Sequence, residues 1–303
     1  MSPSDPGSLA AAVGAVFEEW GPLARAQPDY RKRPAQLAMA EAVAQALQGH
    51  ESLVVEAGTG VGKTYAYLVP LLLSGRRGLV STATKSLQDQ LFFRDLPRLC
   101  ELLGLPVSTA LLKGRSSYLC IHRLQQVRQS DAPQERQVIR QLARVEEWAR
   151  TTRSGDLSEM PGLDERSPLL PLVSSTRDNC LGSECPSYSD CHVMRARREA
   201  MAADLVVVNH HLFFADLALK EGGMAELLPA VEAVVFDEAH QILDTGIQFL
   251  ATTLGTAQIL DFARDLGASG IQHARGLQDW LVVQQACERS AQDLMLACAG
   301  PAA

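Results

Sequence analysis

The stretch "EAGTGVGKT", residues 56–64, decides the fold of this chain. It follows the apolar run "SLVVE" (52–56), whose β-branched residues and short length predict a buried strand. It leads into "YAYLVPLLLS" (65–74), which predicts a helix that Pro70 bends or ends. A strand, a Gly-rich turn and a helix in this order are the context that a phosphate-binding loop requires. The alternative is a Gly-rich turn that has this spacing by chance.

The chemistry of such a loop assigns a role to several of its residues. Glycines let the backbone N–H groups of residues 58–63 approach phosphate oxygens, and the dipole of a helix that begins near Lys63 favours their negative charge. Lys63 would reach the β and γ phosphates of ATP, and the Thr64 hydroxyl would ligate Mg²⁺. The first position is Ala57 rather than glycine, a departure that a small residue tolerates. The predicted ATP-binding residues of the loop are Ala57, Gly58, Thr59, Gly60, Val61, Gly62, Lys63 and Thr64.

A phosphate-binding loop needs an acidic partner at the end of a neighbouring strand, and "AVVFDEAH" (233–240) supplies one. Asp237 follows an apolar run and would hold the metal, directly or through water. Glu238 is placed to orient or deprotonate the attacking water. An apolar run followed by Asp-Glu is common on its own. Together with the loop it predicts a catalytic set of Lys63, Asp237, Glu238 and His240.

Composition limits the class of protein. The 303 residues are 47% hydrophobic and carry a net charge of −7. This charge argues against a surface covered with positive charge for indiscriminate nucleic-acid binding, but not against a local basic groove. No run reaches the roughly 18 apolar residues of a membrane helix, and the N-terminal stretch shows neither a basic start nor a cleavage signal. We therefore expect a cytoplasmic protein without a membrane partner, in which clustered cysteines indicate metal or redox chemistry rather than disulfides.

Strand patterns alternate with helical ones along the chain. Further strands are expected at "GLVSTAT" (78–84), "ADLVVVNH" (203–210) and "VEAVVFDEAH" (231–240). This alternation predicts an α/β fold with a parallel sheet and helices on both faces. Residues 114–200 break the pattern and are interpreted as an insertion. Helices are expected at 8–19, 35–47, 85–104 and 133–150, and throughout the region after 245.

Four cysteines are candidate metal ligands. The gaps between them hold fifty-nine, four and five residues. Zinc knuckles usually present two close pairs, whereas one distant cysteine with a loose trio suits a four-thiolate iron–sulfur cluster better. Spacing alone leaves a zinc ion or unligated thiols open. The candidates are Cys120, Cys180, Cys185 and Cys191, while Cys100, Cys287 and Cys298 are expected in the core.

Together, "EAGTGVGKT" and "DEAH" resemble the first motor domain of superfamily 2 helicases. The cysteines narrow the resemblance to the iron–sulfur branch, similar to XPD and the bacterial DinG-type helicases and most like the YoaA group. It covers nearly the whole chain and includes "YRKRPAQLAMAEAV", "LVSTATKSLQDQL", "LLKGRSSYLC" and "VVVNHHLF".

The resemblance implies a RecA-like motor domain in two parts, 1–113 and 201–248, a 4Fe–4S insertion at 114–200, and the start of a helical arch-like insertion at 249–303. It implies ATP, Mg²⁺ and a 4Fe–4S cluster on the four cysteines, and an adenine-sensing segment with Arg33 and Gln36. The cluster would hold rigid an insertion with too little apolar content of its own.

The resemblance also implies an ATP-dependent DNA helicase of 5′ to 3′ polarity that acts on single-stranded and forked DNA with replication or repair proteins. We expect only the N-terminal motor half, which binds ATP and hydrolyses it poorly without the arginines of a second lobe. Phosphate contacts are expected from Thr82, Thr84 and Gln88, and from basic residues whose alternative is a solvated helix face: Lys113, Arg115, Arg195, Arg197 and Arg198. The rival from another class is a P-loop nucleotide-binding regulator or redox sensor.

Overall fold

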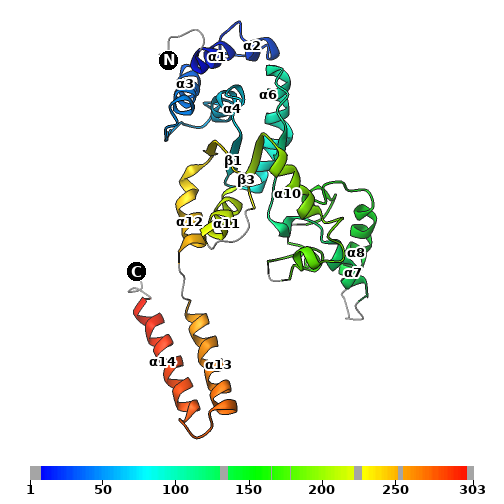
Figure 1. Cartoon of the computed structure of the whole chain (residues 1–303), viewed down its shortest axis with the longest axis vertical. Helices are drawn as coiled ribbons and strands as arrows, with labels where there is room; N and C mark the ends of the chain where they lie inside the picture. Colours follow the sequence, from blue (N-terminus) through cyan, green and yellow to red (C-terminus); the bar gives the residue numbers. More distant parts are fainter. Residues whose placement is uncertain are drawn as a thin grey trace. The chain divides into compact units, whose positions relative to one another are not determined.

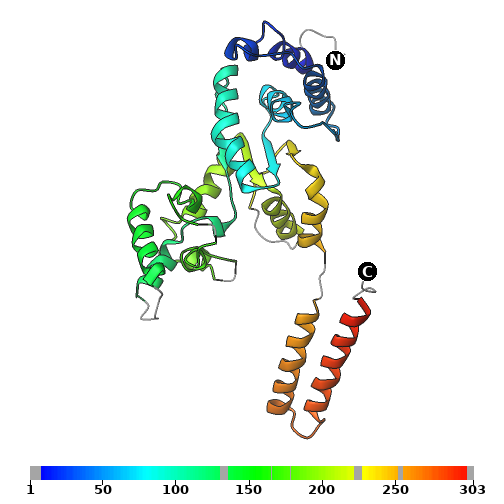
Figure 2. The same cartoon turned by 180° about the vertical axis from the view of Figure 1, so that it is seen from behind.

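The computed structural model describes residues 8–129, 136–164, 166–177, 179–221, 227–251 and 255–298. It divides into two compact units, Met1–Phe249 and Leu250–Ala303, each considered by itself (Figures 1 and 2). The elements in chain order are α1 (Leu9–Val16), α2 (Pro22–Ala26), α3 (Pro34–Gly49), α4 (Lys63–Leu73), β1 (Gly78–Thr82), α5 (Lys85–Gln90), the π-helical η1 (Leu91–Asp95), α6 (Leu96–Leu103), β2 (Thr109–Leu111), η2 (Arg115–Ser117), α7 (Ile121–Gln129), α8 (Arg136–Ala149), η3 (Leu157–Glu159), α9 (Leu170–Val173), η4 (Gly182–Glu184), α10 (His192–Ala202), β3 (Leu205–Asn209), α11 (His210–Glu221), β4 (Ala233–Phe236), η5 (Ala239–Gln241), α12 (Ile242–Leu250), α13 (Thr256–His273) and α14 (Trp280–Cys298).

The first unit is built on a parallel sheet with the strand order β2-β3-β1-β4. In its register, Val80 of β1 lies opposite Val207 of β3 and Val235 of β4. Parallel neighbours need long crossovers, which the intervening helices provide. The parallel α/β fold predicted from the sequence is therefore confirmed.

Alternate residues of the central strands enter two separate cores, as the two-residue period of a strand requires. Val80, Leu205 and Val207 pack with α1, α3, α4 and α6 on one face. Leu79 and Val206 pack on the other face with Ala196 and Ala200 of α10 and with Leu228. Helices thus cover both faces of the sheet.

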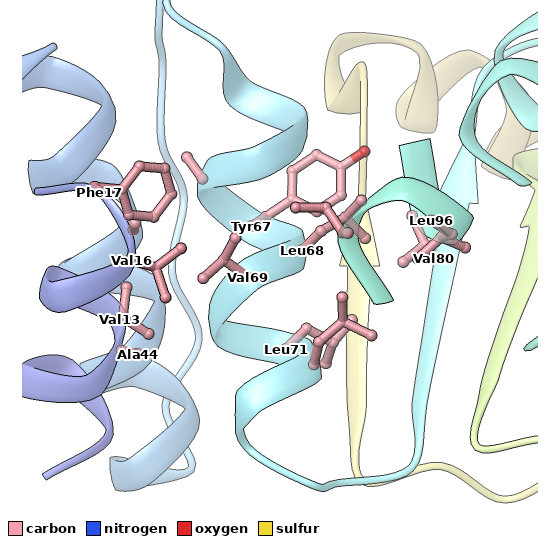
Figure 3. Packing of buried hydrophobic residues seen from close by; sticks show 14 of the residues in the cluster. Val13, Val16, Phe17, Ala44, Tyr67, Leu68, Val69, Leu71, Val80 and Leu96 are labelled. Carbon is pink, nitrogen blue, oxygen red and sulfur yellow. The ribbon is translucent and has the colours of Figure 1, made fainter. Parts of the chain in front are cut away.

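Helix α4 lies between two apolar layers. In Figure 3, Val13 and Val16 of α1 and the adjacent Phe17 lie on one side of it, and Val80 of β1 on the other. Its residues 66–72 are all buried. Burial on two sides fixes the direction of α4, and with it the place of its first residue, Lys63. Pro70 lies inside the helix, which continues to Leu73, so of the two predicted effects of this proline it does not end the helix.

The segment before the loop departs from the sequence prediction. Residues 51–58 form no strand, and Val54 is 95% exposed. A strand needs a neighbour for its backbone groups, and within the described residues no strand lies beyond β4 to pair with this segment. The prediction of a buried strand at 52–56 is therefore wrong for this structure.

The other predicted strands and most predicted helices are present, with the predicted helix 85–104 divided among α5, η1 and α6. Part of the predicted helix 133–150 lies outside the described residues. Strand β2 and helix α10 were not predicted. Cys100 is half-buried against the main core, and burial raises the pKa of its thiol. Cys287 is half-buried, and the side chain of Cys298 lies outside what is described.

The region 114–200 has an apolar core of its own, which corrects the expectation that it cannot hold itself rigid. Eight hydrophobic residues are buried together there, from α7, α8, η3, α9 and the segments between them: Leu119, Leu124, Val138, Val145, Leu157, Met160, Leu169 and Val173. In contrast, most described residues from 176 to 190 are exposed. Any metal would therefore organise the cysteine segment rather than the whole insertion.

The second unit contains α13 and α14, which lie side by side (Figures 1 and 2). Trp280 packs on Gly270, where a Cβ would meet the indole at 2.1 Å, and its Nε1 donates to Ala274 O at 2.9 Å. The all-helical pattern predicted after 245 is confirmed in the described residues. None of the described helices is both long enough and apolar enough to span a bilayer.

Two valines give a matched test of this arrangement. Val80→Ala removes two buried methyl groups from the central strand, and we expect the free energy of unfolding to fall by about 2 kcal/mol. Val54→Ala changes an exposed side chain and should alter it by less than about 0.5 kcal/mol. Urea denaturation of both variants measures the difference, and equal losses would contradict the exposed placement of Val54.

Candidate nucleotide site and cysteine cavity

The phosphate-binding loop lies at the N-terminus of α4 and needs its glycines. Gly60 and Gly62 have φ angles of 80° and 91°, which side-chain-bearing residues rarely adopt. Gly62 also lies against Gln36, because a Cβ at this position would be 2.2 Å from Gln36 Nε2. The backbone conformation therefore favours glycine at both positions, and the space available favours it at Gly62 as well.

Two residues of the predicted adenine-sensing segment hold this loop. Gln36 Nε2 donates to Gly62 O at 2.9 Å, and the Arg33 guanidinium donates to Gly60 O. Gln36 is buried, whereas Arg33 is exposed. Their role toward adenine stays a prediction, and their contacts place them beside the loop.

The loop is open to solvent where a phosphate would enter. Gly58, Thr59 and Gly60 are exposed, and the residues from Val61 to Thr64 are half-buried. Lys63 Nζ bends back and donates to Ala57 O at 3.2 Å. The first N–H groups of a helix have no partner within the helix. This end of α4 thus offers unpaired donors and a movable cation to an anion.

The acidic partner reaches the same place. Asp237 follows β4, and its N–H donates to Ser81 O at 2.9 Å, which continues the pairing with β1. One turn after Lys63, the buried Tyr67 hydroxyl donates to Asp237 Oδ2 at 3.2 Å. Burial raises the pKa of Asp237, although the Tyr67 hydrogen bond and the nearby charge of Lys63 oppose the rise. Lys63 and Asp237 therefore belong to one site.

The two residues of the predicted catalytic set beyond Asp237 lie at the start of η5, whose N-cap is Glu238. Glu238 has a φ of 56°, a left-handed conformation uncommon outside glycine. Its N–H donates to Asp237 Oδ1 at 3.1 Å, and its Oε2 lies 3.5 Å from Nδ1 of the exposed His240. Backbone strain of this kind occurs at functional sites when the surrounding structure holds it. Glu238 is thus set in a fixed direction beside the metal-binding candidate.

Sequence reasoning missed the supports of this site. Tyr67 lies on the buried face of α4, and only its helical spacing from Lys63 could have indicated it. His210 is fully buried behind the sheet edge with Nδ1 2.7 Å from Ser81 Oγ. Burial lowers the pKa of His210, so the imidazole stays neutral near pH 7.

The four candidate ligand cysteines line one cavity of about 90 Å³ in the insertion. Cys120 is fixed by its N–H, which donates to Val173 O at 2.7 Å, and Cys191 precedes α10. Burial raises the pKa of Cys120, and the other three thiols lie near enough to raise it further. The lining brings together Cys120, Cys180, Cys185 and Cys191 with Arg115 and Arg197.

This arrangement fits a cluster better than one ion. A tetrahedral zinc ion needs sulfurs about 2.3 Å from a single point. Among the described residues, no three His, Cys, Asp or Glu side chains converge closely enough to hold one ion. A hole for one water molecule needs only about 10–15 Å³, so the volume of the cavity is several times larger than that. Cysteines spaced around such a volume suit the larger four-iron group.

Three predicted DNA contacts are buried, which corrects them. The Thr82 hydroxyl donates to Thr84 O, and Gln88 Nε2 donates to Leu112 O at 3.3 Å. Lys113 is only 2% exposed and contacts carboxylates. Buried groups that already have partners are not available to a phosphate.

The remaining candidates differ in their exposure. Thr84 is exposed and caps α5, because its hydroxyl accepts from Leu87 N at 3.2 Å. Arg198 is exposed on α10, whereas half-buried Arg195 donates to Arg153 O at 2.7 Å. Arg115 and Arg197 face the cysteine cavity. Of the predicted DNA contacts, only Thr84 and Arg198 are exposed, so their contact with DNA stays a prediction.

The sheet, the Gly-rich loop and the Asp-Glu pair define a P-loop nucleotide-binding domain. Residues 34–134 match the family model described as DEAD/DEAH box helicase. The chain is 46% identical to the ATP-dependent DNA helicase YoaA of Haemophilus influenzae over 254 residues, 84% of this chain and 40% of that protein. With YoaA of Escherichia coli it shares 45% identity over 94% of this chain and 45% of the relative. With DinG of Mycobacterium tuberculosis it shares 40% identity over 75% and 37%.

Residues 34–134 therefore carry a DEAD/DEAH box helicase domain, and the chain is similar to part of the YoaA and DinG ATP-dependent helicases, as the resemblance predicted. It spans less than half the length of these relatives.

The Tyr67 hydroxyl gives a specific test of the site. Tyr67→Phe keeps the buried ring but removes the hydrogen bond to Asp237, and we expect Mg²⁺-dependent nucleotide binding to weaken by about fivefold. That bond lowers the pKa of Asp237. In the variant, binding should therefore be lost at a higher pH as the solution is acidified. Fluorescent-nucleotide titrations at several pH values measure both effects. Tyr118→Phe, in the insertion, is the control and should change neither.

Proposed function

We propose that this chain is the ATP-binding motor part of an ATP-dependent DNA helicase. The observation that most directly supports this proposal is the hydrogen bond from Tyr67 to Asp237, because it brings the start of α4 and the acidic pair to one edge of the sheet. This is the arrangement that ATP with Mg²⁺ requires. The helicase names of the relatives support DNA as the second substrate.

In this proposal each residue of the site has one task. The Lys63 ammonium leaves Ala57 O and contacts the β and γ phosphates, while the loop N–H groups donate to phosphate oxygens. Thr64 and Asp237 hold Mg²⁺, whose charge favours the ionised carboxylate. Glu238 orients the attacking water.

The proposed DNA substrates are single-stranded and forked DNA, with movement from 5′ to 3′. A motor that moves along a strand needs contacts to the backbone rather than to bases, because phosphates carry no sequence information. Exposed Thr84 and Arg198 are the proposed contacts of this kind. The proposed partners are replication or repair proteins.

The four cysteines are proposed to hold a 4Fe–4S cluster. When bound, this group cross-links four thiolates. Cys120, which is anchored to Val173 beside the apolar core of the insertion, would join that core to the exposed segment that carries Cys180 and Cys185. The proposed domain boundaries remain 1–113, 114–200, 201–248 and 249–303.

Lys63→Ala tests the ATP site. Loss of a charge-assisted contact to phosphate should weaken ATP binding by about 10- to 100-fold. Lys220→Ala, which removes a lysine that is paired with Asp216, is the matched control and should bind ATP normally. Isothermal titration with a non-hydrolysable ATP analogue measures both. Equal affinity of the Lys63 variant and the unaltered chain would contradict the loop assignment. ATP binding that never responds to single-stranded DNA would favour a nucleotide-binding regulator.

Metal analysis tests the cysteine assignment. Protein purified without oxygen should contain about four iron and four sulfide per chain and absorb visible light. Cys185→Ser should lose the iron and the colour, whereas Cys100→Ser, which alters a thiol packed on the main core, should keep both. One zinc per chain, retained without colour, would contradict the cluster.

A further inference from the structure

A buried ammonium group lies outside the ATP site. Lys113 Nζ lies 2.6 Å from Asp156 Oδ2 and 2.7 Å from Asp89 Oδ1, and it donates to Ser158 Oγ at 3.1 Å. Burial alone would lower the pKa of Lys113, but the two carboxylates outweigh it and raise the pKa. Lys113 is therefore charged and its charge is fully engaged inside the protein.

The partners of Lys113 come from different parts of the chain. Asp89 belongs to α5, which follows β1 of the sheet. Asp156 and Ser158 belong to the insertion, where Asp156 Oδ1 accepts from both Ser158 N and Ser158 Oγ. Lys113 is thus the residue at which α5 and the insertion meet.

The surroundings hold this meeting point in place. Lys113 N donates to the Tyr118 hydroxyl at 3.0 Å, and Tyr118 forms an isolated antiparallel bridge with Asp156. On the α5 side, Gln88 Nε2 donates to Leu112 O. Two consecutive side chains of α5, Gln88 and Asp89, therefore contact residues 112 and 113. Lys113 also contacts Asp156 of the insertion.

Thr84, the exposed residue proposed above to contact a DNA phosphate, is the N-cap of helix α5. Helix α5 continues without a break into η1 and α6, and the N-terminal end of this helical run needs tertiary contacts to fix its position. The contacts at Gln88 and Asp89 supply them. The direction of Thr84 is thus set by side chains that Lys113 and Leu112 hold.

We propose that Lys113 is a positioning residue that joins α5 to the cysteine-bearing insertion, so that binding of single-stranded DNA at Thr84 depends on the folded insertion. This inference rests on the proposed DNA-binding function. Removal of Lys113 would leave Asp89 and Asp156 facing one another as two buried or half-buried carboxylates, which repel. Removal of Asp89 would instead release α5 while the buried pair of Lys113 and Asp156 remains.

The experiment compares the unaltered chain with Asp89→Ala, Lys113→Met and Lys220→Met. A fluorescein-labelled oligothymidylate reports DNA affinity, a fluorescent ATP analogue reports the nucleotide site, and hydrogen exchange of residues 85–90 reports the order of α5. We expect DNA affinity to fall by about fivefold or more in the first two variants, with faster exchange in α5 and unchanged nucleotide affinity. Lys220→Met breaks an ion pair with the buried Asp216 and should match the unaltered chain in all three.

The outcomes distinguish a failure of the role inferred for Lys113 from a failure of the proposed DNA-binding function. Unchanged exchange and DNA affinity in a folded Asp89→Ala variant would overturn the role of Lys113, whether or not Lys113→Met folds. Failure of the unaltered chain to bind the oligonucleotide would instead overturn the proposed DNA-binding function, and the exchange of α5 would then report the contact between α5 and the insertion alone.

Discussion

The hydrogen bond between Tyr67 and Asp237 is the contact on which the site depends. It joins the first turns of α4 to the end of β4, two elements that are far apart in sequence. Because α4 is buried on both sides, its N-terminus cannot move without disturbing the packing of the main core on each side of the helix. The Gly-rich loop and the acidic pair are therefore held together by packing, before any nucleotide binds.

Local sequence patterns correctly predicted those elements whose formation depends mainly on residues close together in the sequence. The β-branched runs at β1 and β3 and the loop with its helix follow from periodicity and glycine spacing. The run at 52–56 has the same character, yet it is exposed. A strand pattern reports that a segment suits a half-buried pleated surface, and it does not report whether a neighbouring strand is there to pair with.

Charged residues were the least predictable part. Lys113 lies among basic residues in the sequence, which suggested a phosphate contact. Its true partners, Asp89 and Asp156, are separated along the chain and meet only in the folded protein. Gln88 was placed wrongly for the same reason, since its amide turns inward to Leu112 O. The sequence shows which residues precede and follow a polar side chain. Its hydrogen-bond and ion-pair partners are set by the fold and can lie far away in the sequence.

The two parts of the insertion differ in how much apolar surface they bury, and so in what could stabilise them. Residues 119–173 bury apolar side chains, which need no metal, whereas the segment around Cys180 and Cys185 has little buried apolar surface. Burial raises the pKa of Cys120, so without a metal this thiol stays neutral. Ligation would turn four thiols into thiolates and add negative charge to a partly desolvated cavity. Arg115 and Arg197, two of the basic residues expected at a DNA surface, line that cavity instead, and their positive charge would compensate the thiolates of the proposed cluster.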